Sequence, residues 1–452
     1  MPRPNISASG SKIEPVHRLH SYCARFPSEI AETAIREYTR KGDSVYDPFC
    51  GSGTALTASL VLGRHAVGSD IDVLAGMLSS VKCAPASPEA YARWRSRFVN
   101  RLARAFAAVE TGWSRDVRPL PGTTLELNGF RLLLPTFPEL NYWFPPRLIA
   151  LLAAVAAEAH RSASDHMQQV ALVSLSAAII AKWPNTLSYA MDVDHTRPHR
   201  VVQTFPVSRV FETYLRRLDR TINSLSLLRR LYDDAGVLQM LHTSSRVICP
   251  HDARVEAIEV EAESQTLVVT SPPYFNAVDY PRAHRLSVCW MNGRAPEDVA
   301  SRKQYIGIRY VGPEGGTEWF EEHRELRRLI PAPIRSNGRL AKLAGFFADL
   351  EAATAQMWRV LRPGGHAVVV IADNTVKGHR VRAHAALAEI AQQAGFDVVT
   401  RHPREIDTVR RRFPVGTFGF DGPMTHEHVV VLRRPRRRSA RVGRAHTQPS
   451  EH

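Results

Sequence analysis

The segment 41–72 constrains the fold most, because it reads as a strand, a glycine-rich turn, a helix and a second strand. Val45 and Tyr46 belong to the first predicted strand, and Ala66 and Val67 belong to the second. This order of elements is typical of the opening unit of a Rossmann-like sheet. The sequence therefore predicts an α/β chain whose sheet begins near its N-terminus.

The α/β pattern stops near residue 84 and resumes near residue 245. The intervening residues are rich in arginine and alanine and predict helices at 87–110, 148–160, 167–182 and 206–232. Later strands are predicted at 264–274, 366–374, 396–399 and 428–432, with helices at 343–361 and 381–395. We therefore predict four parts: a first part of the catalytic domain (1–84), a large helical insert (85–244), a second part of the catalytic domain (245–432) and a basic, disordered tail (433–452).

The charge of the chain points to a polyanionic partner. Lysine and arginine number 59 against 44 acidic residues, which gives a formal net charge of +15, and nucleic acid is the commonest partner of such a chain. The apolar runs are shorter than the roughly 20 residues of a membrane span, and the N-terminus carries no apolar block. The five cysteines are scattered, which argues against a disulfide framework. We expect a cytoplasmic protein that binds nucleic acid and no membrane.

The first motif, DPFCGSGT (47–54), follows the first predicted strand. Gly51 and Gly53 allow a sharp turn and a close approach of the backbone to a ligand, and the helix that starts near Thr54 offers free N–H groups. Asp47 can accept a hydrogen bond from an ammonium group, and Asp70 ends the second strand, where an acid often binds ribose hydroxyls. The motif predicts a nucleoside-cofactor site, and the alternative is a tight turn with an exposed acid.

The second motif, TSPPY (270–274), also ends a predicted strand, at the sheet edge where ligands bind. The Ser271 hydroxyl and the Pro272 carbonyl are two neighbouring acceptors, which match the two hydrogens of an exocyclic amine. Pro272 and Pro273 restrict the backbone, and Tyr274 offers a stacking face for a planar base. The alternative interpretation is an ordinary Pro-Pro turn with a tyrosine at its rim.

Together the two motifs resemble those of the amino-methylating DNA methyltransferases, which use S-adenosylmethionine (SAM) and carry DPFxGSGT and (S/N/D)PP(Y/F). HSYCARFP (20–27) is similar to the segment that lies along the cofactor in this family, and Asp252 stands where the family often has an acid near the adenine. The resemblance implies a Rossmann-like SAM-dependent methyltransferase sheet and these cofactor-binding residues: Phe26, Pro27, Asp47, Phe49, Gly51, Gly53, Thr54, Asp70 and Asp252. It also implies catalytic roles for Ser271, Pro272, Pro273 and Tyr274.

The serine in the second motif resembles enzymes that methylate N4 of cytosine in duplex DNA, in a restriction-modification or host-protection role and with a cognate restriction endonuclease as a further partner. The alternatives are methylation of N6 of adenine, methylation of the guanine N2 amine in transfer RNA, and a non-catalytic nucleic-acid-binding protein with a degenerate SAM fold. The cofactor motif precedes the catalytic motif, whereas many serine-type relatives have the reverse order.

Four arginines are candidates for contacts with DNA. Arg282 and Arg285 follow the catalytic motif and could meet phosphates beside the target base, while Arg197 and Arg200 lie in the insert, which we expect to supply target recognition. No metal site is predicted, because the acidic and histidine residues at 192–199 match no standard ligand spacing. Asp373-Asn374 ends a predicted strand at the same sheet edge, either as a substrate-side pair or as a turn cap.

Overall fold

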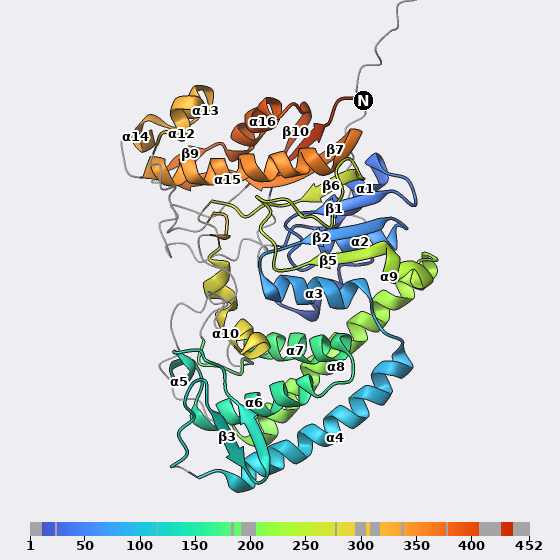
Figure 1. Cartoon of the computed structure of the whole chain (residues 1–452), viewed down its shortest axis with the longest axis vertical. Helices are drawn as coiled ribbons and strands as arrows, with labels where there is room; N and C mark the ends of the chain where they lie inside the picture. The colour runs from blue at the N-terminus through green and yellow to red at the C-terminus, as the bar shows by residue number, and fades with distance from the viewer. Residues whose placement is uncertain are drawn as a thin grey trace, which may run out of the picture.

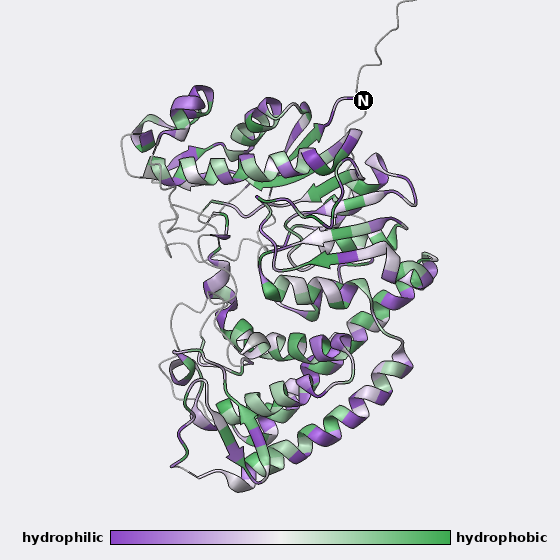
Figure 2. Cartoon of the chain, viewed as in Figure 1, coloured by the Kyte–Doolittle hydropathy of each residue, from purple (hydrophilic) through white to green (hydrophobic). Residues whose placement is uncertain are grey.

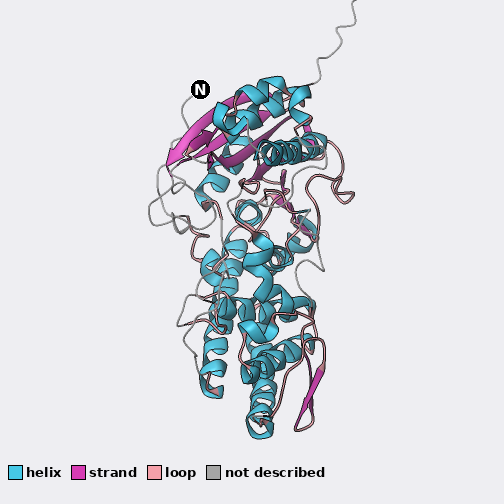
Figure 3. Ribbon diagram, turned by 90° about the vertical axis from the view of Figure 1, so that its left-hand side faces the viewer, coloured by secondary structure: helices cyan, strands magenta, loops and turns pink. Residues whose placement is uncertain are grey.

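The chain folds into a sheet covered by helices on both faces, with a block of helices packed beside it (Figure 1). Figure 3 shows the strands of the sheet gathered in one half of the molecule and the helices of the insert in the other. The computed structural model describes residues 11–22, 25–114, 116–181, 185–190, 205–275, 278–293, 304–307, 317–335, 339–376, 378–405 and 426–436.

The central sheet has seven strands in the order β10-β11-β7-β6-β1-β2-β5. Its strands are β1 (Ser44–Asp47), β2 (His65–Ser69), β5 (Ser245–Ile248), β6 (Gln265–Thr270), β7 (Leu361–Ala372), β10 (Asp397–Glu405) and β11 (His426–Arg433). Neighbouring strands are parallel except where β11 pairs antiparallel with β7 and β10. The chain builds outward from β1 to one side, then returns to β6 and builds to the other. The strand order thus reverses between β1 and β6, where ligands of such sheets bind.

Helices cover both faces of this sheet, which explains why its central strands are continuous apolar runs. In β6, Leu267 and Val269 pack on one helical layer, and Val268 between them packs on the opposite layer. Helices α1 (Ser28–Tyr38) and α2 (Thr54–Val61) contribute to the first layer, and α15 (Arg339–Val360) and α16 (Ala383–Gln393) form the second. The predicted fold class, an α/β sheet with a large helical insert, is confirmed.

The insert is mostly helical but also contains a small hairpin. Its elements are α4 (Pro88–Gly112), β3 (Thr124–Leu127), β4 (Phe130–Leu133), α5 (Leu140–Trp143), α6 (Pro146–His160), α7 (Asp165–Ile179), α8 (Val207–Asp234), the 3-10 turn η2 (Leu238–Met240) and α9 (Leu241–Ser244). Helix α4 begins where Ser87 accepts a hydrogen bond from the Ala90 amide. Figure 2 shows apolar residues concentrated on α6 and α7, whose side chains share one core with α3 (Val73–Cys83) beside the sheet. The insert is therefore packed continuously against the sheet domain.

Three local details complete the fold of the sheet domain. Pro27 is the N-cap of α1, and the Ser28 hydroxyl donates a hydrogen bond to Glu14. Strand β7 starts at Leu361 and includes the segment LRPGG. The strand β11 includes Arg433, which had been assigned to the tail, and residues 437–452 lie outside the described part of the chain.

Other elements were not predicted. They are η1 (Val16–Leu19), α10 (Tyr280–Asn292), α12 (Trp319–Glu322), α13 (Arg324–Arg328), α14 (Ala332–Arg335) and the hairpin of β8 (Asn374–Val376) and β9 (His379–Val381), besides the edge strand β5. In the part of the chain that the structure describes, no helix has the length and apolar character needed to cross a membrane.

Candidate active site

A cavity lies at the carboxyl ends of β1, β2 and β6, at the reversal of the strand order. It holds about 730 Å³ of space, part of it open to solvent. Its lining contains eight of the predicted site residues: Phe26, Phe49, Gly51, Thr54, Asp70, Asp252, Ser271 and Pro273. The structure therefore brings residues of the glycine-rich motif and of the TSPPY motif to one cavity.

The glycine-rich loop takes a conformation that favours glycine at two positions. Gly51 and Gly53 have φ values of +50° and +80°, in the left-handed region. A Cβ atom on Gly53 would lie 2.9 Å from the Ser79 hydroxyl oxygen, which itself donates a hydrogen bond to the Gly51 carbonyl. Gly53 is the N-cap of α2, so it lies behind the cavity wall that Gly51 and Thr54 form. The loop thus turns the backbone of Gly51 toward the cavity, and Phe49 of the same loop also lines it.

Asp47 lies beneath this loop and not in the cavity lining. Its side chain is buried, and its Oδ1 accepts hydrogen bonds from the Thr270 hydroxyl at 2.5 Å and from the Phe49 amide at 3.0 Å. Its Oδ2 is buried without a hydrogen-bond partner among the described residues. Burial raises the pKa of the Asp47 carboxyl to about 7. Asp47 therefore joins the end of β1 to the end of β6 and retains one unused acceptor.

Asp70 lies at the edge of the cavity and helps to hold the glycine-rich loop. Its Oδ2 accepts from the Gly51 amide at 2.8 Å, and its Oδ1 accepts from the Asp72 amide at 2.9 Å. Burial, reinforced by the nearby Asp72 carboxylate, raises the pKa of the Asp70 carboxyl to about 7. Next to Asp70, the side chain of Ile71 packs against Tyr305, and both line the cavity. An acid and an apolar wall thus stand side by side.

Three further cofactor predictions concern residues before α1 and after β5. Phe26 lines the cavity, but Pro27 does not, because it is the N-cap of α1. Asp252 lines the cavity while its carboxylate is held by Arg254, with 2.6 Å between Oδ2 and Nη2. Part of the charge of Asp252 is thus already compensated within the protein.

The TSPPY loop is held by contacts with β8 and β11. The Asn374 amide donates to the Phe275 carbonyl at 2.7 Å, which fixes the residue that follows the motif. The Ser271 hydroxyl lies 3.3 Å from the Tyr274 hydroxyl, which in turn lies 3.4 Å from Glu427 Oε2. Ser271 and Pro273 face the cavity, while Pro272 is buried and Tyr274 lies outside its lining.

The candidate DNA-binding arginines differ in what can be said of them. Arg282 and Arg285 belong to α10, which packs against α7 of the insert. Arg285 forms an ion pair with Glu139 at 3.0 Å, and its guanidinium lies over the Trp143 ring, so a phosphate contact would have to replace these interactions. Arg197 and Arg200 lie outside the described residues.

Sequence reasoning missed a large part of the cavity wall. The missed lining residues are Tyr22, Arg25, Pro48, Cys50, Ser52, Ile71, Asp72, His251, Ala253, Tyr280, Gln304, Tyr305 and Ile306. The Tyr22 ring lies 3.4 Å from the position of a Cβ atom on Gly51 and 5.0 Å from the ring of His284. Tyr22 belongs to HSYCARFP, and this residue lies beside the glycine-rich loop. The sequence offered little to identify Tyr280 and Tyr305 as lining residues, beyond their being aromatic residues that follow the TSPPY motif.

The known proteins that are similar in sequence to this chain include DNA methyltransferases. A family model described as DNA methylase matches residues 4–74. The type II methyltransferase M.MvaI of Kocuria varians is 22% identical over 443 residues, which cover 93% of this chain and 91% of that protein. M.BsoBI of Geobacillus stearothermophilus, also a type II methyltransferase, is 21% identical over 471 residues, covering 90% of this chain and 82% of that protein.

Among solved structures, a SAM-dependent methyltransferase from Methanosarcina mazei has a TM-score of 0.29 and 8% sequence identity. The match covers 89% of this chain and 97% of that one. A TM-score of that size does not establish a common fold, so the fold assignment stands on the strand order and on the helices described above.

Proposed function

We propose that this chain, which belongs to the amino-methylating DNA methyltransferases, transfers a methyl group from SAM to the N4 amine of cytosine in duplex DNA. One observation carries the proposal: Ser271 faces the same cavity as the glycine-rich loop and Asp70. An acceptor for the target amine therefore lies within one cavity of the groups that suit a nucleoside cofactor. That proximity is what a direct transfer between two bound molecules requires.

The residues around the cavity fit SAM, which supplies an activated methyl group when bound. The Oδ2 of Asp47, buried without a partner in the described structure, suits an ammonium group, and the N-terminus of α2 suits a carboxylate. Asp70 suits ribose hydroxyls, and Ile71 with Tyr305 forms an apolar wall that suits the adenine. Phe26, Phe49, Gly51, Thr54 and Asp252 complete this proposed site. Gly53 and Pro27 do not line the cavity, and we propose that they shape the backbone beside it as the N-caps of α2 and α1.

The target amine needs activation, because its lone pair is delocalised into the base. The Ser271 hydroxyl and the Pro272 carbonyl would each accept one N–H hydrogen bond, which localises the lone pair on nitrogen for attack on the methyl group. This direct transfer needs no covalent nucleophile on the protein. Consistent with that, burial raises the pKa of the Cys50 thiol at the cavity wall, which disfavours its reactive thiolate.

A base inside a duplex cannot reach Ser271, so the target nucleotide must leave the helix. Tyr274 would stack on the extruded base. In the structure the Tyr274 hydroxyl accepts a hydrogen bond from Ser271 and donates one to Glu427, which leaves the Ser271 oxygen able to accept from the arriving amine. The insert would grip the duplex and read the sequence, with Arg197, Arg200, Arg282 and Arg285 as candidate phosphate contacts. A cognate restriction endonuclease fits the relatives, which are type II methyltransferases.

Mass spectrometry of nucleosides tests the proposal directly. Unmethylated duplex DNA treated with the full chain and SAM should yield N4-methylcytosine, whereas the Ser271→Ala variant should form it about 10- to 100-fold more slowly. N6-methyladenine would replace cytosine by adenine as the target and leave the mechanism intact. Methylated guanine in transfer RNA, with unmodified DNA, would overturn the choice of substrate. The absence of any product with SAM bound would overturn the proposed catalysis.

A further inference from the structure

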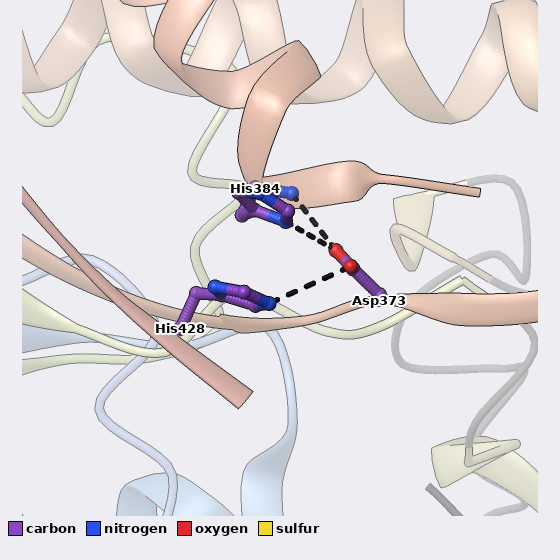
Figure 4. Close-up of side chains that lie close together, drawn as sticks. All are labelled: Asp373, His384 and His428. Carbon is purple, nitrogen blue, oxygen red and sulfur yellow. Dashed lines mark hydrogen bonds and ion pairs between the residues drawn. The ribbon is translucent and has the colours of Figure 1, made fainter. Parts of the chain in front are cut away.

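Three metal-binding side chains converge at the edge of the sheet that carries the catalytic loop. Asp373 follows β7, His384 lies in the first turn of α16, and His428 lies on β11. One potential ligand atom from each lies within 4.8 Å of the other two. Figure 4 shows both imidazoles directed at the Asp373 carboxylate. We propose that these residues bind one divalent transition-metal ion, with Zn²⁺ as its representative.

The distances suit a single ion. Nδ1 of His384 lies 2.6 Å from Oδ1 of Asp373, and Nε2 of His428 lies 3.5 Å from Oδ2. Zn²⁺ binds imidazole nitrogen at about 2.0–2.1 Å and carboxylate oxygen at about 2.0–2.2 Å, so two of its ligands are at most about 4.3 Å apart. The His384 and His428 rings are stacked, with centroids 3.7 Å apart and an angle of 13° between their planes, so the rings must turn relative to each other for their nitrogens to converge on one ion. Two imidazoles and one carboxylate form a ligand set typical of borderline divalent metals.

The surroundings of the cluster supply part of a second coordination sphere. Asp373 and His428 are buried, and His384 is nearly so, which keeps bulk water from competing for the ion. Arg380 donates to Oδ2 of Asp373 at 2.8 Å, which orients the carboxylate and leaves Oδ1 for the ion. The same guanidinium lies 3.4 Å from Nε2 of His428, and this contact must be given up when the nitrogen binds a metal. The Arg380 side chain is 56% exposed, so it can move away.

The location of the cluster suggests what the ion does. Asp373 precedes Asn374, whose amide holds the Phe275 carbonyl just after the TSPPY loop. His428 follows Glu427, and neighbouring residues of a strand point to opposite faces, so β11 contacts Tyr274 on one face and the cluster on the other. An ion would tie β7, α16 and β11 together directly behind the catalytic loop. Its role would be positional, and no step of methyl transfer passes through it.

Metal titration of the full-length chain, purified without a histidine tag and stripped with a chelator, tests the site. Co²⁺ should give visible absorption bands that saturate at one ion per chain, and Zn²⁺ should abolish them. Zn²⁺ should also raise the Tm, by about 2 °C or more at saturation. His384→Ala and Asp373→Asn should each lower Zn²⁺ affinity by more than about 100-fold, beyond the loss seen when only an outer-sphere partner is removed.

His379→Ala is the matched control, because this histidine lies nearby on β9 and outside the cluster. It should bind Co²⁺ like the unmodified chain. Asp373→Asn keeps the size of the side chain, and circular dichroism shows whether each variant is folded. The proposal is overturned if the unmodified chain gives no Co²⁺ bands, since the cluster is then only a hydrogen-bonded His-Asp-His group. It is equally overturned if the folded variants bind as tightly as the control.

Discussion

The loops that follow β1 and β6 lie side by side at one edge of the sheet, yet they are held in opposite ways. Below the first loop, the contacts leave Asp47 Oδ2 buried with no hydrogen-bond partner in the described residues, and burial raises the pKa of that carboxyl to about 7. In the second loop, the Ser271 hydroxyl already contacts Tyr274, which contacts Glu427. One loop holds an unused acceptor, and the other has its reactive hydroxyl engaged.

These different contacts of Asp47 and Ser271 predict different responses of the two loops when SAM and the target base bind. A cofactor that enters the first site supplies a partner that the fold lacks, so its binding stabilises the existing arrangement. A base that enters the second site meets a Ser271 hydroxyl that already donates its proton to Tyr274, so the Ser271 oxygen can accept from the amine without giving up that contact. We therefore expect changes in the first loop to act on SAM binding and changes in the second to act on methyl transfer.

The largest effect is expected for Ser271→Ala. This change removes one of the two acceptors for the target amine, and a hydrogen bond that strengthens as charge develops is worth about 1.5–3 kcal/mol. Single-turnover methylation should slow by about 10- to 100-fold, while calorimetry should show unchanged SAM affinity. Unchanged turnover would remove Ser271 from the mechanism, and a loss of SAM affinity would mean that the two loops are coupled.

Asp70→Ala should have the next largest effect, on the cofactor side. It removes the carboxylate that suits the ribose hydroxyls and also the acceptor of the Gly51 amide. SAM affinity should fall by about 1–3 kcal/mol, with methyl transfer at saturating SAM nearly retained. Asp70→Asn is the control, because its amide oxygen can still accept from Gly51, so it should lose less affinity. If SAM binds the Ala variant as tightly as the unmodified chain, Asp70 does not contact the cofactor.

The raised pKa values of Asp47 and Asp70 predict a pH dependence of smaller size. Both carboxyls have a pKa of about 7 in the folded, ligand-free chain, above the ordinary value near 3.9 of an unfolded chain. Their contribution to stability is therefore fully present below about pH 4 and is lost as the pH rises through about 7. The ligand-free chain should thus lose part of its free energy of unfolding over this range.

SAM should favour the ionised carboxylates, so its binding should release protons near pH 6.5. For one carboxyl, the affinity should rise about tenfold between pH 6 and pH 8. Calorimetry in two buffers of different ionisation enthalpy measures the proton release, and Asp47→Asn should reduce it. Binding without proton release would show that SAM does not change the ionisation of these carboxyls. The Asp47 carboxylate would then not be the group that receives the ammonium of SAM.

The two loops were predicted from the sequence because each is a local motif at the end of an apolar strand. DPFCGSGT and TSPPY fix their own turns, and parallel strands place both at one edge. The opposite wall could not be predicted in this way. Tyr280 reaches the cavity because α10 packs against α6 and α7 of the insert. Tyr305 reaches it by packing against Ile71 and Tyr280.

Two other omissions have physical reasons. Strand β5 lies at the edge of the sheet and is only partly buried, so its four residues lack the apolar run that identified β6. In the metal-binding cluster, His384 follows Asp373 by 11 positions and His428 follows His384 by 44 positions, each on a different element. Such separations match no sequence motif, so the cluster could not be predicted from the sequence. The helices of the insert were predictable from their periodicity, whereas its docking on α3 and α10 required the three-dimensional core.

The smallest effect is expected for Tyr274→Phe, which separates the hydroxyl of this residue from its ring. The variant loses the contacts with Ser271 and Glu427 but keeps the stacking face. Because the Ser271 oxygen can accept from the amine with or without its own hydrogen bond to Tyr274, turnover should change by less than about fivefold, the scale of one neutral hydrogen bond. Tyr274→Ala also removes the ring and should cost about 1–3 kcal/mol of base binding. Neither variant should alter SAM affinity. Equal losses of turnover in both variants would assign the role of Tyr274 to its hydroxyl, which holds Ser271, and not to stacking of its ring on the base.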